Sequence, residues 1–143
     1  MLSEFFEENR NEYYDGLLHV SQKGIWQEWI RFFLKAVIVR GEETAGRAKQ
    51  LLDLREEFRN KVQTVTSAAL VLRIVDKLFV TPGLNITSMA KGLHVTYPTA
   101  QSYVVGLVKA GILVEVTGHK RNRIFLAPRI LDIVSRPSKA KSK

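Results

Sequence analysis

Hydrophobic residues recur at helical spacing through the first sixty positions of the chain. The first such segment begins near Ser3, a plausible N-cap, and ends at Gly24, where glycine suits a helix end. A second segment, 26–38, has its apolar residues on one face, and a third covers 45–62. Around Gly41 the pattern weakens, which leaves open whether this glycine breaks one long helix or only bends it.

After these helices the periodicity lapses and then resumes. Residues 62–67, rich in Thr and Val, predict a short linker, and residues 70–79 predict a buried helix that a turn at Pro82 and Gly83 ends. A short helix follows, which Thr87 can cap. Its predicted inward positions are Ile86, Met89, Ala90, Leu93 and Val95.

A sharp turn at His94 separates this short helix from a longer one. Thr96 can cap the longer helix, and Pro98 falls in its first turn, where a missing N–H costs nothing. The helix ends near Ala110 and Gly111. Its predicted buried positions are Ala100, Val104, Leu107 and Val108.

Strand-like segments appear only near the C-terminus. Residues 112–117 and 123–127 predict two strands joined by a basic hairpin loop, 118–122. Pro128 opens a last short helix through Val134, and 136–143 has the composition of a disordered basic tail. The expected fold class is therefore mainly α. A helical segment over 1–62 is followed over 63–135 by a helical domain with a small β-hairpin.

The charge is distributed very unevenly along the chain. Residues 1–62 carry ten Lys and Arg against eleven Asp and Glu, a net of −1, and residues 63–143 carry twelve against three, a net of +9, which together give +8. Such a concentration of positive charge is typical of proteins that bind a polyanion, most often nucleic acid.

The composition argues against several other classes of protein. There is no cysteine, so disulfides and thiolate metal sites are excluded, and the default location is the cytoplasm. The three histidines have no metal-ligand spacing, and the nine glycines form no phosphate-binding loop. No apolar run approaches the roughly 18 residues of a membrane span. Neither a metal nor a cofactor is expected.

The order of elements over 66–134 resembles the winged helix-turn-helix domain of bacterial regulators. Residues 88–100 and 107–113 have the residue types that such domains use at the two helices and at the turn into the wing. The resemblance implies that the helix from Tyr97 to Ala110 enters the major groove of DNA while the wing contacts the backbone. A transcription-regulatory role follows from this type of fold.

A second resemblance covers nearly the whole chain. In this domain and in four short segments, the chain resembles the C-terminal part of Fic-family proteins. The segments are EYY at 12–14, WQEWIRFFL at 26–34, LLDLREEFR at 51–59 and TGHKRNRIF at 117–125. Fic proteins typically transfer AMP from ATP-Mg to a protein hydroxyl, using the motif His-Pro-Phe-x-x-Gly-Asn-Gly-Arg. That motif is absent here. The resemblance therefore implies that 1–62 are the helices that follow the motif and that this chain is not itself an enzyme.

Two groups of residues are the predicted DNA contacts. On the helix, Gln101 can bond adenine in bidentate fashion, and Ser102 or Thr99 can reach a phosphate or a base edge. Because the outward residues of this helix are mostly uncharged and the wing is basic, backbone contact is favoured over strong base reading. The predicted contacts are Thr96, Tyr97, Thr99, Gln101, Ser102 and Lys109 on the helix, and His119, Lys120, Arg121, Asn122 and Arg123 on the wing.

The aromatic stripe of the 26–38 helix has two interpretations. Trp26, Trp29 and Phe33 could form a stacking surface for bases, but their helical phase favours core packing. Part of this apolar face would remain free to self-associate, so a homodimer through 1–62 is expected. In the competing interpretation, the chain is a non-catalytic accessory part of a Fic AMP-transferase. Its winged helix would then recognise a target protein or hold a dimer.

Overall fold

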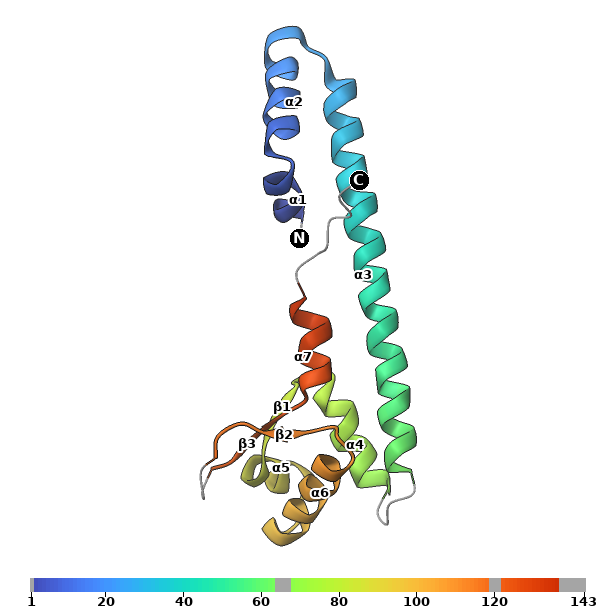
Figure 1. Cartoon of the computed structure of the whole chain (residues 1–143), viewed down its shortest axis with the longest axis vertical. Helices are drawn as coiled ribbons and strands as arrows, with labels where there is room; N and C mark the ends of the chain where they lie inside the picture. Colours follow the sequence, from blue (N-terminus) through green and yellow to red (C-terminus); the bar gives the residue numbers. More distant parts are fainter. Residues whose placement is uncertain (1, 64–67, 119–121, 137–143) are drawn as a thin grey trace. The chain divides into compact units, whose positions relative to one another are not determined.

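The computed structural model describes residues 2–63, 68–118 and 122–136. Within them the chain forms seven α-helices and one small three-stranded antiparallel sheet (Figure 1). The mainly helical fold class is therefore confirmed. By packing, the chain divides into two compact units, Met1–Ala48 and Lys49–Lys143. Among the described helices, none combines the length and the hydropathy needed to cross a membrane.

The N-terminal unit contains α1 (Leu2–Glu8), α2 (Arg10–Lys23) and the first part of α3 (Trp26–Val62). The single helix expected from residue 3 to 23 is interrupted at Asn9, whose backbone leaves the helical region at φ −115° and ψ 41°. Gly24 ends α2 in the left-handed conformation at φ 68°, as predicted. Figure 1 shows α1 and α2 alongside the first part of α3.

Aromatic rings fill the interior of this unit. Phe5, Phe32 and Ala36 are buried, and Phe6, Tyr13 and Trp29 pack against them. Gly16 allows α2 to approach α3 closely, because a Cβ there would lie 3.3 Å from Cε3 of Trp29.

One charged side chain is buried in the same unit. Arg40 is 7% exposed and donates to Glu8 at 2.8 Å and to Glu43 at 2.9 Å, beneath the ring of Phe5. A buried cation requires such partners, because desolvating an unpaired charge costs several kcal/mol. The guanidinium thus ties α1 to α3.

Helix α3 runs without a break through Gly41, which resolves the alternative that the sequence leaves open. A glycine inside a helix costs only about 1 kcal/mol relative to alanine, and tertiary packing readily offsets that cost. The later part of α3 belongs to the C-terminal unit, where Leu54, Phe58 and Val62 are buried. Val62 is therefore a core residue and not part of a linker. Gln63 is an exposed turn residue, and positions 64–67 of the expected linker lie outside the described residues.

The C-terminal unit continues with α4 (Ala68–Leu78), β1 (Gly83–Asn85), α5 (Ile86–Leu93), α6 (Tyr97–Lys109), β2 (Val114–Glu115), β3 (Ile124–Leu126) and α7 (Pro128–Ser135). The strands pair in the order β1-β3-β2. Strand β1 was not expected from the sequence, since three residues are too short to show an alternating pattern. Gly83 pairs with Leu126, and a Cβ on it would lie only 2.8 Å from Leu126 Cδ2. In Figure 1, α5 and α6 lie below the sheet and α7 above it.

Three local predictions in this unit need correction. The N-cap of α5 is Asn85 and not Thr87, because the Asn85 side chain accepts from the amides of Thr87 and Ser88. Val108 is 39% exposed, whereas Ala100, Val104 and Leu107 are buried as predicted. The strands are also shorter than the predicted 112–117 and 123–127.

Candidate nucleic-acid interface

Two helices of the C-terminal unit are joined by a short, well-defined turn. Three residues, His94 to Thr96, connect α5 to α6. His94 occupies the left-handed region at φ 55°, and its amide bonds to the end of α5. Thr96 then caps α6, as predicted. A turn of three or four residues between two helices is one feature of the helix-turn-helix motif.

The side of α6 that faces away from the core carries the residues predicted to contact DNA. Tyr97 is 46% exposed, Ser102 and Lys109 are exposed, and Thr99 and Gln101 are half-buried. A shallow groove runs along this side of the helix. It is lined by Pro98, Gln101, Ser102, Val105, Gly106 and Lys109.

The N-terminus of α6 has fewer free backbone N–H donors than the N-terminus of a helix usually offers. The Thr96 hydroxyl accepts from the amide of Thr99 at 3.4 Å and lies 2.9 Å from the Thr99 hydroxyl. Pro98 has no amide proton. Among the first three residues of α6, only Tyr97 has a backbone N–H that is not already bonded to the cap. A phosphate bound at this helix N-terminus would therefore meet one free amide and not several.

The hairpin between β2 and β3 is described only at its two ends. His119, Lys120 and Arg121 lie outside the described residues. Asn122 adopts φ 53°, and Gly118 adopts φ 61° on the other side of the hairpin. Arg123 is half-buried, 3.6 Å from the carboxylate of Glu115 and over the ring of Phe125. Its charge is therefore partly neutralised within the protein.

Most carboxylates of this unit form ion pairs, on elements other than α5 and α6. Arg55 and Arg59 both donate to Asp76, and these bonds lower the pKa of that carboxyl. Arg129 donates through two nitrogens to Glu57, and together with Lys61 it lowers the pKa of Glu57 from its usual 4.5 to about 2. Asp132 pairs with Arg136. These groups lie on α3, α4 and α7.

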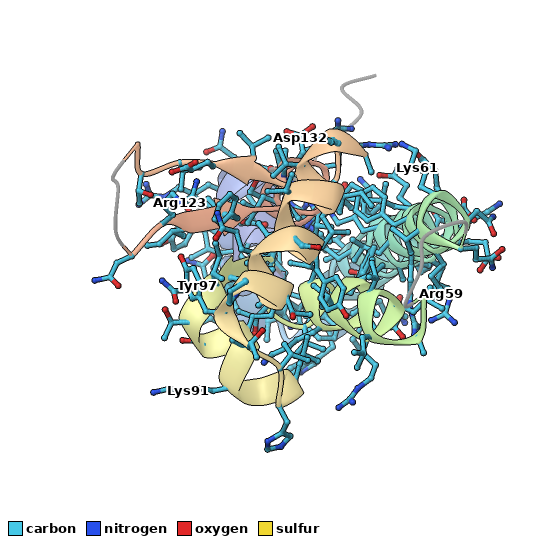
Figure 2. All side chains as sticks on the ribbon, turned by 90° about the horizontal axis from the view of Figure 1, so that it is seen from below. Arg59, Lys61, Lys91, Tyr97, Arg123 and Asp132 are labelled. Carbon is cyan, nitrogen blue, oxygen red and sulfur yellow. The ribbon has the colours of Figure 1, made fainter. Side chains whose placement is uncertain are left out.

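The segment from α5 through α6 contains positive charge only. No acidic residue occurs between Lys77 and Val114, and Lys91 and Lys109 project from α5 and α6. Together with Arg73 and Lys77 of α4, they make no ion pair among the described residues. Figure 2 shows Lys91, Tyr97 and Arg123 on one side of the unit, away from Arg59 and Lys61.

Arg73, Lys77 and Lys91 are site candidates that the sequence interpretation missed. For Lys77 and Lys91 the signal that could have identified them is the long acid-free stretch, whereas Arg73 precedes Asp76 and belongs to no such stretch. No three metal-ligating side chains gather within the described parts of the chain. No model of a known protein family matches the chain.

Proposed function

We propose that residues 63–135 form a winged helix-turn-helix domain that binds double-stranded DNA, and that the protein regulates transcription through it. The turn from α5 into α6 and the β2–β3 hairpin support this assignment. In the proposed complex, α6 lies in the major groove and the hairpin follows the phosphate backbone. Function is inferred from the site and not from the fold alone.

The distribution of charge is the observation that carries the proposal. Residues 49–143 hold 16 Lys and Arg and 6 Asp and Glu, a net of +10, whereas residues 1–48 hold 6 and 8, a net of −2. The six acids lie on α3, α4, α7 and β2, and α5 and α6 have none. The helices α5 and α6 therefore carry positive charge only, within a unit of net positive charge, which attracts phosphate at long range.

Backbone contact dominates in this proposal. The exposed side of α6 carries one cation, Lys109, and its best base-reading group is Gln101, which can bond adenine N6 and N7. The wing cation Arg123 is shared with Glu115, so Lys91 and Lys109 are the cations freest to reach phosphate. We expect a strong salt dependence and a modest sequence preference.

The test is the salt dependence of duplex binding by the full chain, measured by fluorescence anisotropy. Replacing Lys91 and Lys109 together by alanine should lower the log-log slope of affinity against salt by about 1.8, since each lost phosphate contact removes about 0.9. Lys49→Ala is the matched control, because Lys49 is exposed on α3 and outside the proposed interface. It should leave the slope nearly unchanged.

Two outcomes would overturn the proposal. One is the absence of binding at low salt, which would favour the alternative that the domain recognises a protein. The other is an equal change of slope in the double variant and in Lys49→Ala, which would indicate attraction by net charge without a defined interface.

A further inference from the structure

One sector of α3 in the N-terminal unit is apolar and uncovered. On the side that packs against α1 and α2, Phe32 and Ala36 are buried. On the adjacent side Trp26, Ile30 and Val37 remain 58%, 49% and 42% exposed. Fully burying an aliphatic or aromatic side chain stabilises by about 1.5–3 kcal/mol, so contiguous exposed groups of this size usually mark an interaction surface.

Part of the exposed sector forms one stripe along the helix axis. Successive residues of an α-helix are rotated by about 100°, so positions spaced 4, 3, 4, 4, 3 and 4 residues apart stay within a stripe about 80° wide. Large side chains occupy its first half and small ones its second half, on either side of Val37. Its members are Trp26, Ile30, Phe33, Val37, Gly41, Thr44 and Ala48, all exposed.

The second half of the stripe is hollowed. A groove lies over it, and a Cβ added at Gly41 would meet no atom within 4 Å. The first half therefore projects and the second half is recessed. The groove is lined by Leu2, Val37, Arg40, Gly41, Thr44, Ala45 and Ala48.

The spacing of the stripe is the same in both directions from Val37. If two copies pair antiparallel about a twofold axis at Val37, each large residue lies opposite a small one, because a twofold interface sets a surface against itself. Trp26 then lies opposite Ala48, Ile30 opposite Thr44, and Phe33 opposite Gly41. A parallel pairing in register would instead set Trp26 against Trp26 and Gly41 against Gly41, and the recessed halves would stay empty.

From this complementarity we propose that the N-terminal unit forms a twofold-symmetric homodimer through the antiparallel pairing of α3 about Val37. The projecting half of each stripe fills the groove of the other copy. This inference does not rest on DNA binding.

The first test measures the dimer dissociation constant of the full chain by sedimentation equilibrium. Gly41→Leu fills the recess that receives Phe33 and should weaken the dimer about 100-fold, since overpacking at two symmetric sites costs about tenfold at each. Gly46→Leu is the matched control. A Cβ at either glycine has open space, and leucine favours a helix over glycine, so neither change disturbs the single chain. Gly46 lies off the stripe, and its variant should dimerise like the wild type.

The second test fixes the orientation by disulfide cross-linking. The chain contains no cysteine, so a single introduced thiol reports one position. Val37→Cys lies on the proposed axis and should form a covalent dimer on mild oxidation, whereas Ala48→Cys should not, because its own counterpart lies far along the opposite helix. A parallel dimer would cross-link at both positions.

Three results would overturn the proposal. A chain that stays monomeric at every concentration would show that the stripe serves another partner. A Gly41→Leu variant that dimerises like the wild type would place the interface elsewhere. Equal cross-linking of Val37→Cys and Ala48→Cys would rule out the antiparallel register. None of these readouts involves DNA, so a failure of the DNA-binding proposal would leave them unchanged.

Discussion

At the scale of single residues, Glu57 shows how this protein uses charge for structure. Its carboxylate joins α3 to α7 through Arg129 and to the next turn of α3 through Lys61. Hydrogen bonds from these two cations hold the pKa of Glu57 at about 2, below its usual 4.5. A carboxyl whose pKa is lowered on folding stabilises the folded state above its unfolded pKa, and the effect is lost as it becomes protonated.

We therefore predict that Glu57→Gln lowers the free energy of unfolding at pH 7, and that the difference from the wild type shrinks as pH falls from about 4.5 towards 2. The loss at pH 7 should be about 0.5–1 kcal/mol, because solvent screens a pair this exposed. Urea denaturation across this pH range measures it.

The control for this prediction is Glu56→Gln. Glu56 is the exposed neighbour on α3, and its side chain makes no hydrogen bond within the described residues. Its replacement should cost less at pH 7. A Glu57→Gln difference that persists undiminished at pH 2 would contradict the proposed role of the ion pair.

At the scale of elements, α3 has different roles along its length. Its first part packs against α1 and α2 and presents the stripe around Val37. Its last part supplies Phe58 and Val62 to the core beneath α4 and α7. The packing division lies between Ala48 and Lys49, inside a continuous helix, whereas the sequence pattern predicts a boundary near Val62.

If the last part of α3 is structural for the C-terminal unit, Phe58→Ala should destabilise that unit by about 3–5 kcal/mol. Leu52→Ala on the same helix, where the leucine is 63% exposed, should cost less than about 1 kcal/mol. Far-UV circular dichroism follows both units during urea denaturation, and tryptophan fluorescence follows only the N-terminal unit, which contains both tryptophans. Equal losses in the two variants would argue against this role of α3.

At the scale of the whole molecule, the two units differ in both charge and surface chemistry. The N-terminal unit has a net charge of −2 and exposes large apolar residues, and the C-terminal unit has a net charge of +10. We propose different partners for these surfaces: a second copy of the chain for the first unit and a polyanion for the second. If both proposals hold, a dimer carries two DNA-binding domains and binds a duplex with two sets of contacts.

We therefore expect two chains per duplex, with binding that weakens about 100-fold in Gly41→Leu and stays unchanged in Gly46→Leu. A stoichiometric titration at a duplex concentration well above the dissociation constant gives the number of chains. Anisotropy at low concentration gives the affinity. One chain per duplex, with equal affinity in both variants, would show that dimerisation and DNA binding are uncoupled.

Much of this picture depends on local rules that operate within a few residues. Backbone geometry and side-chain spacing determine four of these features. They are the helix end at Gly24, the Thr96 cap, the proline in the first turn of α6 and the spacing of the buried residues of α4. The uneven net charge is equally a property of the sequence. These features could be predicted because neighbouring residues determine them.

Other features depend on residues far apart in the sequence, and only the tertiary structure decided them. Strand β1 forms by pairing with β3, where Gly83 lies opposite Leu126, and Arg123 is partly neutralised because the strand pairing brings Glu115 beside it. Gly41 stays helical within the continuous α3 despite its low propensity, and Val62 is buried through contacts made beyond the helix. Spacing alone predicted an apolar face on the 26–38 helix, but which part of that face remained exposed depended on where α1 and α2 packed. Burial and pairing are properties of the folded chain, since they depend on what each side chain meets in three dimensions.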